Sequence, residues 1–330
     1  MEFSWKKRGL VFSAAGQFGW MNSHAQVPTA IVLEDIIRVF FASRPRRDLS
    51  LSSYVDLAID DPKTVVYLHS EPILATGSAG AFDEHGIMPQ HALLDHDSIY
   101  LFYAGWSRRA SIPYSNWIGL AKYDRNEGSF VKCSDAPILD RISGDILSAT
   151  GLSCILEGSG WVGWYASGTD WVPSPDNSSL NPIYEIRQCR SHDLLHWSRD
   201  LRPLFQTKLD KEANTRPTVI FVGGKWLMWF CYRSAFDFHD GKGSYRIGFA
   251  WTDNLLTWHR NDGLAGINVH DNGWDSTMIA YPNIVRVKDR YLMFYNGNGF
   301  GEEGFGYAEV SAEEMEEFSQ SLSAQPREGI

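Results

Sequence analysis

Short apolar and aromatic segments recur along the chain about every 60 residues. The clearest copy, Asp275 to Val310, contains in order an acidic residue, a proline, an apolar segment, a tight turn, an aromatic segment, a glycine-rich loop and a small-residue segment. Segments of four to eight such residues bounded by turn residues are typical of β-strands. The aromatic segments of the five copies align on Phe41, Tyr103, Tyr165, Tyr232 and Tyr295, with spacings of 62, 62, 67 and 63 residues.

A repeat of this length made of short strands is typical of a β-propeller. We therefore predict an all-β protein with one domain, 1–330, folded as a five-bladed β-propeller. The predicted blades cover about residues 22–70, 80–140, 142–206, 210–265 and 272–310. The last copy lacks an outer strand, and residues 3–12 resemble the outer strands of other copies. We predict that this N-terminal strand closes the ring and removes the free edges.

After the last copy, the segment SAEEMEEFSQSL begins with Ser311 and has Glu314 three residues later. A serine and a glutamate at this spacing form a capping box at a helix N-terminus. We therefore predict a short C-terminal helix.

Acidic residues stand at one offset in four of the five copies. Twenty residues before the aromatic anchor lie Asp83, Asp145, Glu212 and Asp275, whereas the first copy has Met21 there, with Asn22 and His24 close by. In a propeller the blade heads and the longer loops share one face, so we expect the four carboxylates to surround a central funnel. Coupled carboxylates suit general acid–base catalysis. Alternatively, each acid caps a turn or pairs with an arginine of the next blade.

Basic and aromatic residues near the blade heads are candidates for ligand binding. The predicted substrate-binding residues are His24, Arg44, His85, Trp106, Trp171, Arg216, Arg233 and Asp275. Arginines can hold a carboxylate or phosphate through two hydrogen bonds, although these arginines can instead neutralise the acids. The histidines are candidates to orient a water molecule or to act as a base. Trp106, Trp171 and Tyr184 are candidate platforms for sugar rings, and core packing is the alternative interpretation for a tryptophan.

Composition excludes several classes of function. The formal net charge of −10 and the isoelectric point near 5.5 argue against nucleic-acid binding. No apolar stretch approaches the 18 residues of a transmembrane helix, and the N-terminus has no apolar run of a secretory signal, so we predict no membrane insertion and a cytoplasmic protein. The four cysteines show no metal-ligand spacing, and no zinc or EF-hand motif occurs, so we predict no metal and no cofactor. The oligomeric state is left open.

Five blades with carboxylates at the blade heads resemble the glycoside hydrolases of families 43, 62, 117 and 130. The resemblance covers Ser4 to Val310. The chain is also similar to hydrolase-like propellers associated with bacterial surface-polysaccharide biosynthesis. It implies an inverting glycosidase with Glu212 as general acid and Asp145 in the position of the acid-tuning aspartate. The first-blade base of family 43 has no match in the segment Asn22 to Pro28. Asp83 or Asp145 is therefore our candidate base.

Three functions follow from these residues, each with a carbohydrate or sugar derivative as ligand. An inverting glycosidase requires two carboxylates flanking a pocket. A phosphorylase or another sugar-acting enzyme of polysaccharide assembly requires arginine and histidine beside one acid. A carbohydrate-binding propeller needs only aromatic residues.

Overall fold

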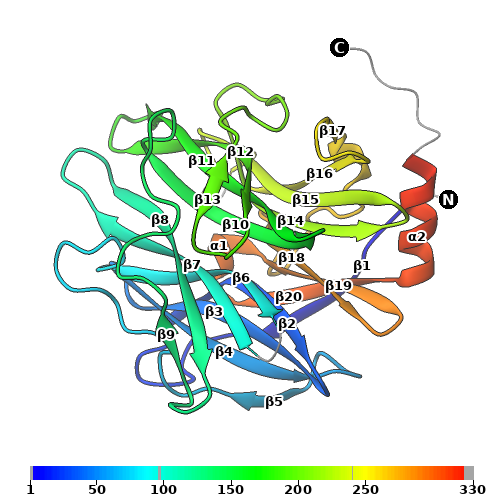
Figure 1. The fold of residues 1–330 in the computed structure, drawn as a ribbon, viewed down its shortest axis with the longest axis horizontal. Coiled ribbons are helices and arrows are strands. Elements are labelled where there is room, and N and C mark those ends of the chain that lie inside the picture. The colour runs from blue at the N-terminus through cyan, green and yellow to red at the C-terminus, as the bar shows by residue number, and fades with distance from the viewer. Residues whose placement is uncertain (1–2, 96–97, 240, 323–330) are drawn as a thin grey trace.

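The computed structural model describes residues 3–95, 98–239 and 241–322, which form a nearly all-β fold with one helix near the C-terminus (Figure 1). The all-β prediction and the prediction of a short C-terminal helix are therefore confirmed. The strands form three four-stranded sheets and one eight-stranded sheet. The eight-stranded sheet contains two consecutive antiparallel groups joined by one parallel bridge between Ser50 and Gly86. We number the resulting strand groups 1 to 5.

Each group contains four strands in sequence order, except that the N-terminal strand belongs to group 5. Group 1 contains β2 (Ser23–Leu33), β3 (Ile36–Arg46), β4 (Leu49–Ala58) and β5 (Val65–Leu68). Group 2 contains β6 (Gly86–Asp95), β7 (Ser98–Arg108), β8 (Tyr114–Asp124) and β9 (Ser129–Lys132). Group 3 contains β10 (Ser148–Glu157), β11 (Gly160–Pro173), β12 (Leu180–Ser191) and β13 (Trp197–Arg199). Group 4 contains β14 (Glu212–Val222), β15 (Lys225–Ser234), β16 (Arg246–Thr252) and β17 (His259–Arg260), followed by the 3-10 helix η1 (Asp262–Leu264). Group 5 contains β18 (Ala280–Val287), β19 (Arg290–Asn296), β20 (Phe305–Ser311) and β1 (Lys6–Phe12), with α1 (Asn298–Gly301) between β19 and β20.

The first strands of the five groups lie together in the middle of the molecule. Strand β2 contacts β6, β6 contacts β10, β10 contacts β14, β14 contacts β18, and β18 contacts β2. Their labels accordingly gather near the centre of Figure 1, whereas β5, β9 and β17 lie toward its edges. Residues from different groups can therefore meet at the ends of the first strands.

Each first strand carries one polar residue at an equivalent position, directly after a β-bulge. These five residues, which we call the polar ring, are Thr29, His91, Ser153, Thr218 and Asn283. Their register partners on the second strands are the fully buried aromatic residues Phe40, Phe102, Trp164, Trp229 and Phe294. Bulges are recurrent devices for re-aiming side chains at functional sites.

Members of the polar ring connect neighbouring groups by hydrogen bonds. The Asn283 side-chain oxygen accepts from the Ala30 backbone N–H at 2.7 Å, and the Thr218 hydroxyl accepts from the Ile284 N–H at 3.1 Å. Such bonds satisfy backbone groups of first strands that are paired on one side only. The polar-ring residues therefore form hydrogen bonds between neighbouring groups, which the apolar side chains of the second strands cannot form.

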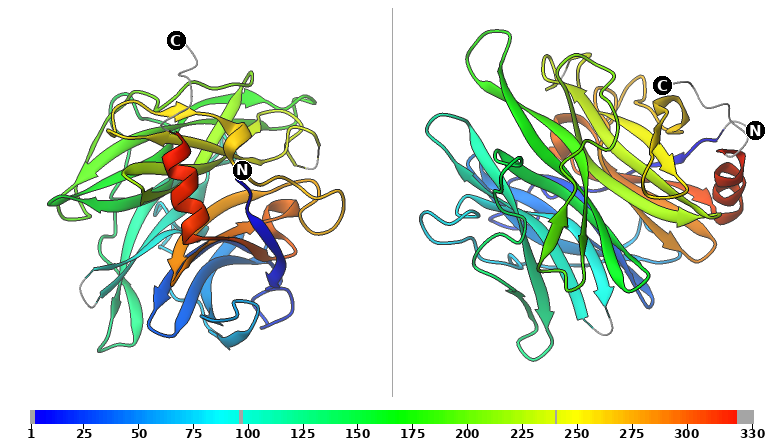
Figure 2. Two further views of the ribbon diagram at one scale, coloured as in Figure 1. Left: turned by 90° about the vertical axis from the view of Figure 1, so that its right-hand side faces the viewer. Right: turned by 45° about the horizontal axis from the view of Figure 1, so that its top comes forward.

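The N-terminal strand completes group 5, and the C-terminal helix packs beside its start. Strand β1 pairs antiparallel with β20, which is the pairing expected for residues 3–12. Helix α2 (Ala312–Ser321) begins with the capping box of Ser311 and Glu314. Its Phe318 ring stacks on Phe3 at 3.9 Å between centroids, so helix α2 lies beside the segment that leads into β1 (Figure 2).

An ion pair fixes β1 to its group. The Lys7 Nζ lies 2.7 Å from an Asp275 carboxylate oxygen, and the two side chains are 11% and 1% exposed. We expect Lys7→Met to lower the free energy of unfolding by about 3–5 kcal/mol, because the substitution leaves a buried carboxylate without its cation. Denaturant unfolding measures the change. Lys6→Met, on the exposed side of the same strand, is the matched control, and equal losses in both variants would contradict the assignment.

Candidate functional site

The four head carboxylates are buried in ion pairs with cations from the fourth strand of their own group. The pairs, which we call the head ion pairs, are Asp83–Lys132 at 2.6 Å, Asp145–Arg199 at 2.7 Å, Glu212–Arg260 at 2.6 Å and Asp275–Lys7 at 2.7 Å. The carboxylate residues are all at most 1% exposed. The alternative that Arg44, Arg216 and Arg233 neutralise these acids is therefore wrong.

A tyrosine of the second strand completes three of the head ion pairs. The hydroxyl groups of Tyr103, Tyr165 and Tyr295 donate to the head carboxylates at 3.3, 2.8 and 3.0 Å. A Cβ on Gly119 would come within 2.3 Å of the Tyr103 Cζ atom, which shows that the Tyr103 ring lies across the third strand. This explains the glycine in that strand, since a side chain there would displace the ring.

The head carboxylates consequently lie toward the outer strands and do not surround a central funnel. Each is reached by a ring lying over the third strand and by a cation on the fourth. The expectation of four converging carboxylates therefore differs from the structure. The physical reason is that a buried carboxylate needs a cation, and the fourth strand supplies it. The catalytic roles of Asp83, Asp145 and Glu212 remain predictions.

Group 4 departs from the alignment of the sequence copies. The register partner of the third-strand Gly248 is Phe230, and a Cβ on that glycine would lie 2.6 Å from the Phe230 ring. Phe230, and not Tyr232, is therefore equivalent to Tyr103 and Tyr165. Because phenylalanine has no hydroxyl, Glu212 uses its second oxygen to accept from the backbone N–H groups of residues 208 and 209.

A different set of residues meets at the ends of the first strands. We call it the tyrosine–arginine cluster, and its members are Gln26, Arg44, Tyr114, Tyr184, Arg233, Tyr245 and Tyr281. All five strand groups contribute at least one member. Only side chains near the centre of the molecule can make such contacts.

Groups 1 and 5 are connected through the side-chain amide of Gln26. The Arg44 Nη2 donates to the Gln26 side-chain oxygen at 3.0 Å, and Gln26 also hydrogen-bonds to Tyr281. The Tyr281 ring lies 5.6 Å from the Tyr245 ring of group 4, between centroids. Arg44 is half-buried, and burial lowers the pKa of its guanidinium.

Groups 2, 3 and 4 meet around Arg233, which is 2% exposed. Its Nε donates to the Tyr245 hydroxyl at 3.3 Å, and its guanidinium stacks on the Phe238 ring at 3.8 Å. Tyr184 hydrogen-bonds to Tyr114, and both interact with this guanidinium. Burial raises the pKa of Tyr245 to about 12 and that of Tyr184 well above its usual value, so both hydroxyls stay protonated and can donate.

The arginines at the centre have no carboxylate partner. Among the residues that the structure describes, no carboxylate lies within 4.0 Å of the guanidinium nitrogens of Arg44, Arg216 or Arg233. Burying a charge without a counter-charge costs several kcal/mol. The centre is therefore positively charged, while the acids are neutralised in the outer strands.

Three first strands have a residue with positive φ immediately before a proline. Val27, Arg216 and Tyr281 have φ of 56°, 53° and 57°. Such values are strained for non-glycine residues, and strain of this kind clusters at functional sites. Tyr281 belongs to the tyrosine–arginine cluster, and Val27 follows Gln26. The strain thus coincides with the convergence of the strand groups.

His24 and Glu302 border the cluster beside Arg44. Burial, together with the Arg44 charge, lowers the pKa of His24 to about 4, so its ring is neutral above that pH. The carboxylate of Glu302, which is exposed and follows α1, interacts with the Arg44 guanidinium. One histidine, one arginine and one acid are thus near one another.

The remaining predicted binding residues lie in three places. Trp171 lies at the rim of the cluster, 5.4 Å from the Tyr114 ring. Trp106 donates to the Ser50 hydroxyl at 2.7 Å and packs against His85, so this pair lies between groups 1 and 2. Arg216 is 1% exposed and Asp275 belongs to a head ion pair. His24, Arg44, Arg233 and Trp171 are therefore brought together, and the others are not.

Gln26, Tyr245, Tyr281 and Glu302 were not identified from the sequence. A signal for Tyr281 existed, because prolines recur in four copies at positions 28, 89, 217 and 282. The residues before them are at the bulges, where simple strand alternation fails. Tyr245 and Glu302 lie in connections that carry no repeat signal.

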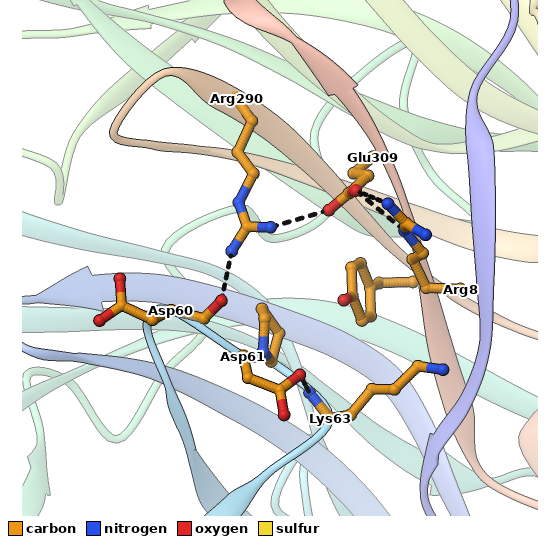
Figure 3. Close-up of a pocket in the computed structure, with 8 residues that line it drawn as sticks. Arg8, Asp60, Asp61, Lys63, Arg290 and Glu309 are labelled. Atoms are coloured by element: carbon orange, nitrogen blue, oxygen red, sulfur yellow. Dashed lines mark hydrogen bonds and ion pairs between the residues drawn. The ribbon is translucent and has the colours of Figure 1, made fainter.

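Two surface cavities are lined by none of the residues of the cluster. The larger cavity has a volume of about 290 Å³ and is lined by Arg8, Asp60, Lys63, Arg290 and Glu309 (Figure 3). It lies where group 5, with β1 and β20, meets the segment that follows β4 of group 1. Its charges are largely paired, as in the Arg290–Glu309 bond of 3.0 Å. The smaller, about 220 Å³, lies next to Asp145 and is lined by residues 144, 146, 147, 168, 169 and 187. Neither cavity contains any of the predicted site residues.

Within residues 3–95, 98–239 and 241–322, no group of three His, Cys, Asp or Glu side chains is placed to hold a metal ion. In the same part of the chain, no helix has the length and apolar character needed to cross a membrane.

The fold is similar to that of solved glycoside hydrolases. A glycosyl hydrolase from Bacteroides ovatus superposes with a TM-score of 0.71 over 94% of each chain at 12% identity. A thermostable family-43 glycoside hydrolase superposes with a TM-score of 0.61 over 89% of this chain and 90% of the other, at 15% identity. A structure from the GH130 family of mannoside phosphorylases, which contains glycoside hydrolases, gives 0.64 over 94% of each chain at 12% identity. Such low identities establish similarity of fold alone.

No family model matches the chain. Uncharacterized protein Rv1502 of Mycobacterium tuberculosis strain H37Rv is 32% identical over 309 residues, covering 92% of this chain and 98% of that protein. Uncharacterized protein MT1551 of strain CDC 1551 matches equally well. The protein belongs to the family of these mycobacterial proteins.

His24 makes stability depend on pH. Its folded-state pKa of about 4 lies below the ordinary value of 6.5, so the unfolded chain binds the proton more tightly. Stability should therefore fall as pH drops from about 6.5 to about 4, with a contribution of up to about 3 kcal/mol. Unfolding free energies of wild type and His24→Gln between pH 7 and pH 4 measure it. His91 and the acids titrate in both proteins, so identical pH slopes would contradict the placement of His24.

Proposed function

We propose that this protein is a five-bladed propeller, closed by the pairing of β1 with β20, that acts on a carbohydrate and binds an oxyanion in its central tyrosine–arginine cluster. The supporting observation is that the cluster holds Arg233 without a carboxylate partner among the described residues, and Arg44 with only the exposed Glu302 near it. A cytoplasmic location and a role in surface-polysaccharide assembly remain predictions from the sequence.

The chemistry of the cluster fits an anionic sugar. A guanidinium group can donate two parallel hydrogen bonds to a carboxylate or a phosphate. Arg44 uses Nη2 for Gln26, which leaves donors for a ligand. The tyrosine hydroxyls of the cluster can donate to sugar oxygens, and the Trp171 ring at the rim offers an apolar face to a sugar ring. The oxyanion is either an acidic group of the sugar or inorganic phosphate used as a co-substrate.

Inverting hydrolysis, with Glu212 as acid and Asp83 or Asp145 as base, is our sequence-based hypothesis for the reaction. A general acid must reach the proton acceptor on the substrate. Glu212 is 1% exposed, and Arg260 and two backbone N–H groups occupy its oxygens. Catalysis by Glu212 therefore requires the head ion pair to open when substrate binds.

Phosphorolysis is the second candidate, and the arrangement around Arg44 favours it. Phosphorolysis needs basic residues beside one acid, and Arg44 lies with His24 and Glu302. Phosphate supplies the attacking oxygen, so no protein base has to activate water. The departing sugar oxygen still needs a proton, and Glu302 beside Arg44 is our candidate donor. A screen with and without phosphate separates the two reactions.

The ligand experiment compares neutral, acidic and phosphorylated glycosides and nucleotide sugars, each with and without inorganic phosphate. We expect turnover or ligand-induced thermal stabilisation only when an oxyanion is present. Arg44→Met should weaken binding of the anionic ligand about 10- to 100-fold, because a hydrogen bond to a charged group contributes about 1.5–3 kcal/mol. Calorimetry measures the affinity.

Two variants control this prediction. Arg108→Met removes an exposed arginine that pairs with Asp48, and it should leave affinity unchanged. Arg44→Lys keeps the charge without the planar donor geometry, so its affinity should be intermediate. Preference for neutral sugars, undiminished in Arg44→Met, would contradict the oxyanion proposal.

Glu212→Gln separates a structural role from a catalytic one. The contacts of Glu212 lead us to expect a loss of about 3–5 kcal/mol in the free energy of unfolding, as for the breaking of a buried ion pair. Arg260→Met should give a similar loss, since it removes the partner. Turnover per folded molecule is measured on the substrate found in the screen. Unchanged stability with turnover lowered 10²- to 10⁴-fold would show that Glu212 is the acid and that its ion pair is dispensable.

A further inference from the structure

Arg216 carries a buried charge that the tyrosine–arginine cluster does not use. Its side chain extends from β14 to the first strand of group 1, where Nη2 donates to the Thr29 hydroxyl at 2.9 Å and to the Pro28 carbonyl at 3.3 Å. Groups 4 and 1 are not neighbours in the cyclic order of first strands. The guanidinium therefore lies between the first strands, at the level of the polar ring.

Two of the three nitrogens of this guanidinium have no acceptor. The Nε and Nη1 atoms are buried and make no hydrogen bond within the described part of the chain. Parallel donation by arginine pairs Nη2 with either Nε or Nη1, so Nε and Nη1 point in different directions and each can donate to an acceptor of its own. Unsatisfied buried donors are rare in proteins, and those on a charged group are the most costly.

The surroundings supply no negative charge but do supply another free donor. Cys231 interacts with the Arg216 charge, yet burial raises the pKa of its thiol to about 12, so it stays neutral. His91 of the polar ring also lies near Arg216, and burial lowers the pKa of its ring to about 3, so it stays neutral too. The equivalent residue of group 3 is Ser153, whose buried hydroxyl has no partner among the described residues.

We propose that Arg216, with the polar ring, binds a small monovalent anion such as chloride between the first strands. One negative charge neutralises the Arg216 cation, and a free nitrogen of the guanidinium provides a donor. The close contact of the first strands favours a monatomic ion over a tetrahedral oxyanion, which needs more room and more donors. This site lies beyond the proposed carbohydrate function and does not depend on it.

The test is the dependence of thermal stability on chloride. Chloride replaces fluoride at constant ionic strength, and the midpoint of thermal unfolding is recorded. For wild type we expect a saturable rise of about 2–4 °C, because a ligand that binds only the folded state stabilises it by mass action. Arg216→Met should show no such rise. Arg202→Met, which removes an exposed arginine, is the control for general salt effects and should behave as wild type.

Crystals of the wild-type protein grown in sodium bromide give an independent readout. Anomalous scattering should show bromide within hydrogen-bond distance of one of the free nitrogens of Arg216, Nε or Nη1. Ser153→Ala, a smaller change than Arg216→Met, should weaken the chloride effect while leaving the fold intact. The proposal is overturned if Arg216→Met keeps the chloride-dependent rise, or if the bromide crystals show no anomalous peak beside Arg216, because water molecules then satisfy these donors.

Discussion

A carboxylate can be buried only when a cation neutralises it, and the head ion pairs satisfy this constraint within each strand group. The pair Asp145–Arg199 shows the arrangement, because the Tyr165 hydroxyl donates to the same carboxylate. One carboxylate thus joins the start of the group, its second strand and its fourth strand. In group 5 the cation is Lys7 of β1, so the same interaction that closes groups 2, 3 and 4 also ties the N-terminus to the last group.

This constraint determines what remains at the centre. Because the head carboxylates are paired with cations of the outer strands, the side chains left at the centre are Arg44, Arg216 and Arg233 together with tyrosines. Among the described residues, no carboxylate lies within 4.0 Å of their guanidinium nitrogens, and the exposed Glu302 is the one acid that interacts with Arg44. Carbonyl and hydroxyl oxygens reduce the cost of burial, as the Tyr245 hydroxyl does for Arg233, but they supply no negative charge.

The sequence was sufficient for the strands and insufficient for the directions of the side chains. The predicted turn at Glu34 and Asp35 agrees with the end of β2 at Leu33 and the start of β3 at Ile36, because turn residues interrupt an apolar pattern. The common offset identified Asp83, Asp145 and Asp275 as equivalent, whereas Glu212 lies 18 residues before Phe230 and is related to them by its ion pair. The cations of the four acids lie 48–54 residues later or at the other end of the chain, so the sequence did not show them. The bulges at Arg216 and Tyr281 break the alternation from which side-chain direction is inferred.

The positive charge at the centre of the molecule limits the possible reactions more than the fold does. In a two-carboxylate mechanism both acids must reach the substrate, whereas here the head carboxylates are held by cations of the fourth strands. The tyrosines cannot replace them as bases, because burial raises the pKa of Tyr245 to about 12. An anionic substrate or phosphate changes this requirement, since it brings the missing negative charge and, for phosphate, the attacking oxygen as well. The only acid that then has to act is one beside the bound anion, which is the position of Glu302 next to Arg44.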